Sequence, residues 1–192
     1  MSTTPRLSMR ERQRNLTRQS ILDAALEAFA DRGYFATTVD DIVQRAGIGR
    51  ATFYLHFDGK ATVLRNLRDA RMVEWQAQDG FNWGHKQAAS VRKFFERMVD
   101  FYLEAPILYK TLHEARAADP EFAAEHMRTM EELVVEWSRT KTSATTEQLR
   151  LSAAMLYSML DYFMHLWLIQ GWEIERERAI DAMSDALLAA MR

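Results

Sequence analysis

Hydrophobic residues recur along most of this chain at the spacing of a helix and not of a strand. Between residues 17 and 32 they fall on one helical face, and Gly33 is placed to end that helix. No stretch alternates hydrophobic and polar residues in the manner of a half-buried strand, and Gly and Pro are few. The pattern predicts an all-α protein.

A second, shorter helix is expected next, followed by a tight turn. Its hydrophobic residues share one face over residues 39–46, and Thr38 and Asp41 have the spacing of a capping box. Gly47 can close this helix in the left-handed conformation that glycine adopts without steric penalty. A third helix over residues 50–56 then completes a helix-turn-helix, which places its last helix in the major groove of DNA.

The rest of the chain predicts a larger helical body. Asp58 is expected to cap a fourth helix, Pro106 and Pro120 fit the first turn of later helices, and Gly171 marks a break. Further helices are expected near residues 87–103, 106–117, 120–139, 145–170 and 173–191. The predicted architecture is a three-helix head on a helical body.

One segment is apolar and long enough to be tested as a membrane span. Residues 153–172 are almost entirely hydrophobic but include Asp161, His165 and Gln170. An Asp near the centre of a span costs about 2.5 to 3.5 kcal/mol, and no second span or basic cluster accompanies it. We therefore expect a helix that is buried on more than one side and covered by a partner helix.

Charge is distributed unevenly. Although the net charge is −2, residues 1–18 carry five arginines and Glu11, and residues 61–192 carry a net charge of −4. This asymmetry suits a small nucleic-acid-contacting end on a body with another task. The absence of cysteine, together with a polar N-terminus that lacks a secretory signal, favours a cytoplasmic protein.

The third helix offers a surface suited to reading bases. Phe53 and Phe57 lie one helical turn apart and should pack inward, which turns small, hydroxyl-bearing and cationic groups outward. Arg50 can present its guanidinium fork to guanine O6 and N7. Ala51 is small enough to let the backbone approach DNA, and Thr52 or Leu55 could touch a thymine methyl or a base edge.

Other residues are expected at phosphates, which set the register of the protein on DNA but carry no sequence information. Lys60, in the first turn of the fourth helix, would reinforce the favourable helix dipole there. Tyr54 and His56 have an alternative, which is that they only cover the small core. The remaining expected DNA-contacting residues are Arg18, Thr37, Thr38, Tyr54, His56 and Lys60.

The sequence around these residues resembles that of a known protein family. The stretch TTVDDIVQRAGIGRATFYLHFDGK, residues 37–60, closely resembles the DNA-binding signature of the tetracycline-repressor (TetR) family, as does ILDAALEAFADRGYFATT before it. The resemblance implies an all-helical homodimeric repressor whose C-terminal body binds a small molecule and dimerises through its last two helices. Gly49 stands where family members usually have a polar residue, so a weaker cap is expected on the third helix.

The hydrophobic pattern and the resemblance together predict three parts of the chain. They are a flexible basic arm over residues 1–16, a helix-turn-helix DNA-binding domain over 17–60 and a helical ligand-binding and dimerisation domain over 61–192. The arm arginines at positions 6, 10, 12 and 14 could follow a phosphate ridge or enter a minor groove. The alternative is a disordered tail that only aids solubility.

The C-terminal body holds 15 of the 21 aromatic residues. Most should fill a core, but the resemblance raises the expectation of a cavity. We expect a mainly hydrophobic pocket for a bulky apolar or aromatic ligand, with polar anchors drawn from Tyr102, His126, Tyr157, Tyr162 or His165. The expected ligand-binding residues are Trp75, Phe101, Tyr102, Tyr109, His126, Met130, Trp137 and Tyr162.

Two adjacent hydrophobic stripes run along residues 145–170. One, with Leu156 and Phe163, can face the body, while the other faces a two-fold mate in a four-helix interface. The expected dimer-interface residues are Met155, Met159, Tyr162, Leu166, Ile180, Met183 and Leu187.

Patterns for enzymatic chemistry are missing. His113 and Glu114 lack a second histidine four residues on, and the sequence has no glycine-rich phosphate loop. We expect no enzymatic activity, no metal and no cofactor. The predicted function is a ligand-responsive regulator, most simply a repressor, that binds a palindromic operator as a homodimer and is released by a hydrophobic small molecule.

Two alternatives stay open at this point. One is a DNA-binding regulator whose body only dimerises or binds a protein partner, and the other is a ligand-binding module with weak DNA affinity. The expected partners are operator DNA, a hydrophobic effector and a second copy of the chain, without a membrane.

Overall fold

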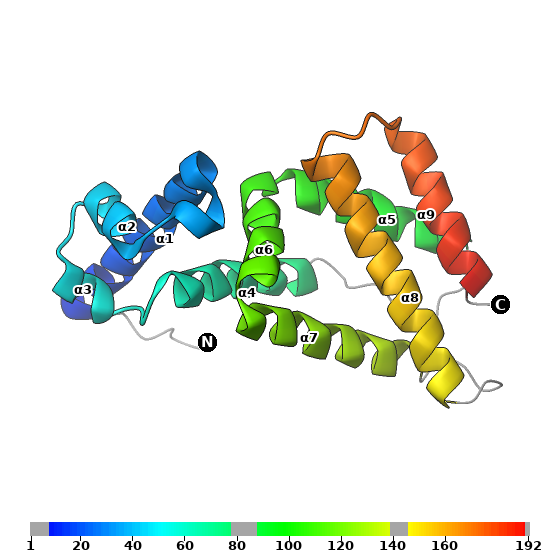
Figure 1. The fold of residues 1–192 in the computed structure, drawn as a ribbon, viewed down its shortest axis with the longest axis horizontal. Coiled ribbons are helices and arrows are strands. Elements are labelled where there is room, and N and C mark those ends of the chain that lie inside the picture. Colours follow the sequence, from blue (N-terminus) through cyan, green and yellow to red (C-terminus); the bar gives the residue numbers. More distant parts are fainter. Residues whose placement is uncertain (1–7, 78–87, 139–145, 191–192) are drawn as a thin grey trace, which may run out of the picture. The chain divides into compact units, whose positions relative to one another are not determined.

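The computed structural model describes residues 8–77, 88–138 and 146–190. These residues form helices, turns and loops, with no strand among them, which confirms the predicted all-α class (Figure 1). The chain divides into two compact units, Met1–Met72 and Val73–Arg192, which are described separately as the first and the second unit.

The first unit contains α1 (Met9–Ala36), α2 (Val39–Ala46), α3 (Arg50–Tyr54) and most of α4 (Lys60–Ala77). The expected start of the first helix near residue 17 was wrong, because α1 begins eight residues earlier. Ser8 caps it, since the Ser8 hydroxyl accepts from Glu11 N–H at 3.2 Å and Ser8 N–H donates to Glu11 Oε2 at 2.7 Å. Of the arginines expected in a flexible arm, Arg10, Arg12 and Arg14 are therefore helical, and Arg6 lies outside the described residues.

Packing in the first unit follows the sequence pattern. Gly33 interrupts α1 with φ 71° and ψ 172°, a conformation that a residue with a Cβ rarely adopts. Phe53 and Phe57 point inward, as predicted, and are almost fully buried. The other buried side chains of the first unit include Ile21, Ala25, Phe29, Ile42, Val63 and Leu64.

The second unit contains five further α-helices among the described residues, and their bounds lie close to the predicted ones. They are α5 (Ala88–Leu103), α6 (Pro106–Ala118), α7 (Pro120–Ser138), α8 (Thr146–Met164) and α9 (Arg176–Ala190). Pro106 occupies the first turn of α6, as expected. The stretch predicted to continue α8 to residue 170 is instead a π-helix, η1 (His165–Ile169), and Gly171 follows with φ 76°.

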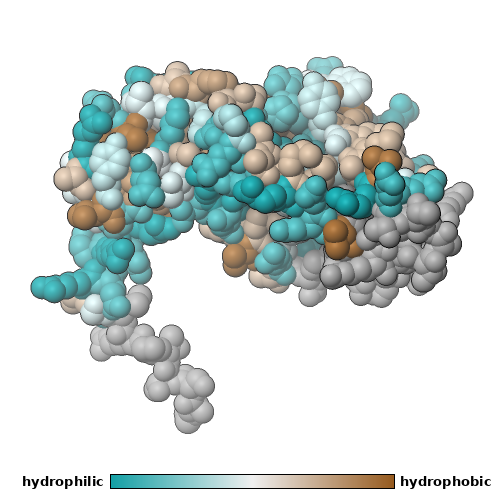
Figure 2. All heavy atoms as spheres, turned by 60° about the horizontal axis from the view of Figure 1, so that its bottom comes forward, coloured by the Kyte–Doolittle hydropathy of each residue, from teal (hydrophilic) through white to brown (hydrophobic). Residues whose placement is uncertain are grey.

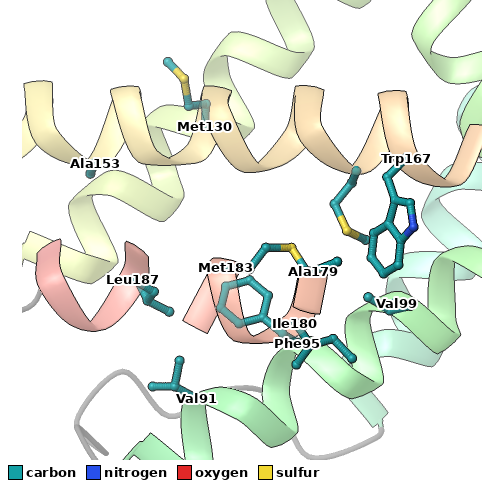
Figure 3. Packing of buried hydrophobic residues seen from close by; sticks show 11 residues of the cluster. Val91, Phe95, Val99, Met130, Ala153, Trp167, Ala179, Ile180, Met183 and Leu187 are labelled. Carbon is teal, nitrogen blue, oxygen red and sulfur yellow. The ribbon is translucent and has the colours of Figure 1, made fainter. Parts of the chain in front are cut away.

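The core of the second unit lies mainly between α5 and α9, which run side by side (Figure 1), and α7, α8 and η1 also contribute side chains to it. Figure 3 shows hydrophobic side chains of both helices directed at one another, together with Trp167 of η1. Arg92 of α5 forms ion pairs with Glu177 and Asp181 of α9 at the edge of this core. The buried members of the cluster are Val91, Phe95, Val99, Met130, Ala153, Met164, Trp167, Ala179, Ile180, Met183 and Leu187.

The surface of the molecule mixes polar and apolar side chains. On the face drawn in Figure 2, hydrophobic side chains occur in separate small groups among hydrophilic ones, as is usual for folded proteins. Within the described parts of the chain, no helix is long and apolar enough to cross a lipid bilayer.

Candidate nucleic-acid interface and polar cluster

The helix-turn-helix is built by local capping. Thr38 begins α2: its hydroxyl accepts from Asp41 N–H at 3.2 Å, and Thr38 N–H donates to Asp41 Oδ2 at 2.8 Å. The Thr38 hydroxyl also donates to Asp41 Oδ2 at 2.7 Å, and this hydrogen bond, followed by the one from Thr38 N–H, lowers the pKa of Asp41. Arg32 of α1 lies 2.9 Å from the same carboxylate and ties α1 to α2. The predicted capping box is confirmed.

The turn between α2 and α3 depends on two glycines that differ in conformation. Gly47 closes α2 with φ 65° and ψ 32°, in the left-handed region, as predicted. Gly49 precedes α3 with φ −83° and supplies no side-chain cap, so the weak capping inferred from the sequence is confirmed. A Cβ added at either glycine would meet no atom within 4 Å.

One face of α3 and of the residue after it points away from the core. Arg50, Ala51 and Tyr54 are exposed, and Leu55 is 76% exposed. Thr52 is half-buried, on the edge of this surface. The four residues predicted to read bases therefore lie together, three of them fully on the outside.

Arg50 is held at the start of α3 by two neighbours. Its Nη1 lies 3.3 Å from Asp40 Oδ1 and 3.4 Å from Oδ2. A hydrogen bond with Tyr54 and then the charge of Asp40 raise the pKa of Arg50. Because both charged side chains are exposed, this pair is weak and can be exchanged for a contact with DNA.

A cationic flank lies next to the end of α3. Arg18 of α1 places its guanidinium 4.7 Å from the ring centre of Phe57 and donates to the Asn66 side chain of α4. Burial, followed by the charges of Arg14 and Arg18, lowers the pKa of the half-buried His56. His56 therefore offers a neutral imidazole at pH near 7, while the positive charge on this flank comes from the arginines.

Two predicted DNA contacts are directed inward instead. Lys60 donates its ammonium to the backbone carbonyls of Tyr34 at 2.6 Å, Phe35 at 3.3 Å and Thr37 at 2.7 Å. Thr37 is buried, and its single hydroxyl proton is shared between Gly33 O at 2.7 Å and Ala28 O at 3.1 Å. An ammonium has three N–H donors, so all those of Lys60 are used to close the end of α1.

The second unit contains a polar cluster around an ion pair, formed by Tyr102, Tyr109, His113, Arg116, His126, Tyr157, Asp161 and His165. Arg116 Nη1 of α6 donates to Asp161 Oδ2 of α8 at 2.9 Å, and the two side chains are only 23% and 18% exposed. His126 Nε2 of α7 lies 3.4 Å from Arg116 Nη1 and 3.9 Å from Asp161 Oδ2. Three helices therefore meet at one partly buried pair of charges.

The histidines of the polar cluster are kept neutral. Burial is the main cause that lowers the pKa of His113, His126 and His165, with Arg116 among the further causes for each. His113 and His165 stack, with ring centres 3.5 Å apart and planes 11° apart. Among the described residues, no three His, Cys, Asp or Glu side chains are arranged to hold a metal ion.

Tyrosines complete the polar cluster. Tyr102 and Tyr109 stack with ring centres 3.8 Å apart and planes 7° apart. Burial and the charge of Asp161 raise the pKa of Tyr102, and the same causes raise that of Tyr157 to about 12. The cavity among these side chains has a volume of only about 10 Å³, about the space of one water. It is lined by Tyr102, Tyr109, His113, Arg116, Asp161, His165 and Ile169.

The structure separates the predicted ligand-binding residues. Trp75, Phe101 and Tyr109 form a chain of ring contacts, with centres 4.9 Å and 6.3 Å apart, that continues to Tyr102. His126 belongs to the polar cluster, Met130 is buried in the hydrophobic core, and Tyr162 is exposed with its ring 6.2 Å from that of His165. The side chain of Trp137 lies outside the described residues.

The partnership of Arg116 with Asp161 was not predicted from the sequence. Asp161 was noticed only as a polar residue in an apolar segment, whereas His165 was also named among the possible polar anchors of a pocket. Nothing in the sequence pointed to Arg116, because it lies 45 residues before Asp161 and its helix has other charges. A larger hollow of about 330 Å³, on the first unit beside Asp23, Glu27 and Arg45, is open to solvent and lined by charges, which does not suit an apolar ligand.

The predicted dimer-interface residues fall into two groups. Met155, Met159 and Tyr162 are exposed on α8, and Leu166 of η1 is half-buried. Ile180, Met183 and Leu187 of α9 are instead buried in the core of their own unit (Figure 3). The assignment of these α9 residues to a surface between subunits is therefore corrected: α5 covers the hydrophobic face of α9.

Two family descriptions match the chain. "Bacterial regulatory proteins, tetR family" matches residues 21–67, and "Tetracyclin repressor-like, C-terminal domain" matches residues 88–189, more than half of the chain. The first match contains the helix-turn-helix, and the second contains the polar cluster and the core between α5 and α9.

Similar proteins share the DNA-binding region in sequence. The chain is 46% identical over 55 residues to the HTH-type transcriptional regulator SrpR of Pseudomonas putida, covering 29% of this chain and 26% of SrpR. It is 39% identical over 46 residues to IcaR, a negative transcriptional regulator of the Staphylococcus aureus biofilm operon, covering 24% of this chain and 25% of IcaR. The similarity thus spans about a quarter of the length of each relative.

Solved structures share the fold over nearly the whole chain. A TetR-like transcriptional regulator from Rhodococcus sp. RHA1 matches with a TM-score of 0.63 at 21% identity, over 98% of this chain and 96% of that one. The fatty acid degradation regulator FadR from Bacillus halodurans matches with a TM-score of 0.61 at 20% identity, over 92% and 96%. The chain belongs to the TetR family of bacterial regulatory proteins, which are helix-turn-helix DNA-binding transcriptional regulators.

Proposed function

We propose that this protein is a ligand-responsive repressor that binds a palindromic operator as a homodimer. The observation that carries the proposal is the outward face of α3, where Arg50, Ala51 and Leu55 are exposed on a helix whose other face is anchored by buried phenylalanines. A rigid helix that presents a guanidinium and small or apolar groups fits the edges of bases in the major groove. A DNA-binding regulator of this kind acts in the cytoplasm.

We assign base contacts to the outward face of α3 and phosphate contacts to the residues around it. Arg50 reads guanine, Leu55 or the edge-lying Thr52 meets a thymine methyl, and Ala51 allows close approach. Thr38, Tyr54, His56 and Arg18, together with the arginines in the first turns of α1, face phosphates. Thr37 and Lys60 are removed from the contacting set, because their polar groups hold the end of α1.

A homodimer is supported by an apolar stripe on α8. Leu151, Met155, Met159 and Tyr162 recur at helical spacing and are all at least half exposed. Such a face is costly in water and is suited to an isologous contact with its own copy. Two copies of α3 would then lie about 34 to 36 Å apart, one turn of DNA, on a two-fold symmetric site.

Release by a ligand is assigned to the second unit. The polar cluster joins α6, α7 and α8 through partly buried charges, so a molecule that enters it must shift these helices. Such coupling between two sites typically amounts to about 1 to 3 kcal/mol, and ligand and DNA must weaken each other equally. The small volume of the cavity favours a second candidate, a regulator whose body only dimerises or binds a protein.

Operator binding by an Arg50→Ala variant tests the DNA-binding assignment. We expect a loss of about 1 to 3 kcal/mol and relaxed preference at one base pair, measured by fluorescence anisotropy on a library of operator variants. Arg128→Ala, which removes the same charge from the exposed surface of α7, is the matched control and should bind normally. An equal loss on all sequences would contradict base reading by Arg50.

A further inference from the structure

We infer that the polar cluster binds a flat aromatic molecule without net charge that carries both a hydrogen-bond donor and an acceptor. This inference rests on the proposed function, because it names the class of effector. It also differs from the bulky, mainly hydrophobic ligand that the sequence suggested.

The charge of the ligand follows from the ion pair. Arg116 and Asp161 neutralise each other at 2.9 Å, and both are largely withdrawn from solvent. A net charge brought into this site would find its counter-charge already taken and would lose its own hydration, which is costly in a partly buried place. His113, His126 and His165, whose pKa values are lowered, add no charge that could compensate.

The ion pair can, in contrast, form hydrogen bonds with neutral polar groups of a ligand. A guanidinium has five N–H donors and a carboxylate has about four acceptor positions, so the contacts of Arg116 Nη1 and Asp161 Oδ2 with each other and with His126 leave capacity on both groups. An acceptor of the ligand can bind Arg116 while a donor binds Asp161. The hydroxyls of Tyr102 and Tyr157 stay protonated, because their pKa values are raised, and add donors.

The flat shape follows from the stacked rings. His113 and His165 are 3.5 Å apart at 11°, and Tyr102 and Tyr109 are 3.8 Å apart at 7°. A planar ring can take the place of one partner in either stack and keep the face-to-face contact. A saturated ring is thicker and cannot. Since the cavity holds only about 10 Å³, a flat molecule also requires the smallest opening of the cluster.

The cluster has an element that can open. His165 and Ile169, at the two ends of η1, both line the cavity, and η1 is a π-helix, a less regular arrangement often found at functional sites. His165 Nε2 lies 3.1 Å from the Gln170 side chain just beyond it. Movement of His165 away from His113 would separate α6 from η1, so binding here changes the packing of the second unit.

A matched series of four probes tests the inference by calorimetry with the full chain. 6-Hydroxy-2-naphthamide is neutral and flat, 6-hydroxy-2-naphthoate is the anion, 6-hydroxy-2-naphthamidine is the cation, and 6-hydroxydecahydro-2-naphthamide is neutral and saturated. We expect the naphthamide to bind at least about tenfold more tightly than each of the other three. Tighter or equal binding of a charged or saturated probe overturns the inference, as does no binding of any probe at about 1 mM.

Substitutions in the polar cluster test whether the naphthamide binds there. Arg116→Met combined with Asp161→Leu replaces the ion pair by groups of similar volume, a change that folded proteins often tolerate, and circular dichroism verifies the fold. We expect naphthamide affinity to fall at least about tenfold. Lys110→Met removes the same positive charge from an exposed site on the same helix and should leave binding unchanged. Unchanged binding by the double variant overturns the assignment of the site.

Operator binding distinguishes this inference from the proposed function. Failure of the probe series, with operator binding intact, removes the ligand class and leaves the DNA-binding regulator. Naphthamide binding that leaves operator affinity unchanged supports the inference and removes release by the ligand.

Discussion

Lys60 illustrates how a cation in a DNA-binding unit can serve the fold. Its position at the start of α4 made it a candidate for a phosphate, yet its three N–H groups end on carbonyls of residues 34, 35 and 37, and its ammonium lies 4.5 Å from the ring centre of Tyr34. It thereby connects the start of α4 to the end of α1, the two segments that flank the helix-turn-helix.

Lys60→Met should therefore lower stability more than it changes contact with DNA. We expect a loss of about 1 to 3 kcal/mol in the free energy of unfolding of the first unit, because three carbonyls lose their donor. Urea unfolding followed by far-UV circular dichroism measures it. The dependence of operator affinity on salt should stay as in the unchanged protein, whereas a phosphate contact would reduce its slope by about 1. A flatter slope at unchanged stability would contradict this role.

At the scale of elements, the turn between α2 and α3 depends on one backbone conformation. Gly47 has φ 65°, Gly49 has φ −83°, and neither would bring a Cβ within 4 Å of another atom. The two glycines therefore differ in backbone conformation and not in the space available for a side chain.

Gly47→Ala should destabilise the first unit by about 1 to 2 kcal/mol, because an L-residue is strained in the left-handed region. Gly49→Ser is the matched variant and should raise stability by a few tenths of a kcal/mol, since serine caps a helix somewhat better than glycine. Thermal unfolding followed by circular dichroism compares them. Equal effects of the two variants would show that the conformation of Gly47 is not the cause.

The packing of α6 against α8 and η1 should depend on pH. Burial lowers the pKa of His113, His126 and His165, so these groups take up protons more readily in the unfolded chain than in the folded one. Their contribution to stability is present above the ordinary pKa of about 6.5 and is lost as the pH falls below it.

Urea unfolding between about pH 7.5 and 5.5 tests this dependence. All five tryptophans lie in the second unit, so tryptophan fluorescence follows that unit alone. We expect stability to decrease on acidification and the decrease to be smaller in a His113→Gln, His165→Gln variant. His56→Gln, in the first unit, is the control and should leave the profile unchanged. A profile that is the same with and without the two cluster histidines would contradict the prediction.

At the scale of the whole molecule, the proposed function requires two copies held at a fixed spacing. Met159 and Met127 offer a matched comparison, because the first lies on the α8 stripe, the second lies on α7, and they are 51% and 52% exposed. Met159→Glu should convert a dimer into a monomer, since it places like charges opposite each other across a two-fold axis. Met127→Glu should not.

Sedimentation velocity measures the oligomeric state, and operator titration measures the consequence. The Met159→Glu monomer should lose most of its affinity for the full palindrome and keep its weak affinity for a half-site. If Met127→Glu dissociated the dimer and Met159→Glu did not, the assignment of the dimer interface to α8 would be wrong.

The sequence by itself determined the helices and the helix-turn-helix. Hydrophobic spacing and caps are local properties, so Thr38, Asp41 and Gly47 indicated where α2 begins and ends, and the prolines indicated where α6 and α7 begin. The early start of α1 was also encoded locally, in Ser8 and Glu11, but the arginines around them suggested an arm instead.

Only the tertiary structure decided what covers each hydrophobic face and which charges meet. Periodicity showed that α9 has an apolar face, but α5, which lies far earlier in the chain, covers Ile180, Met183 and Leu187, so a face expected between subunits is core. The partners of Lys60 and of Arg116 lie 23 to 26 and 45 residues away along the chain. Spacing within a helix carries no information about such distant contacts, because they depend on how the helices pack together.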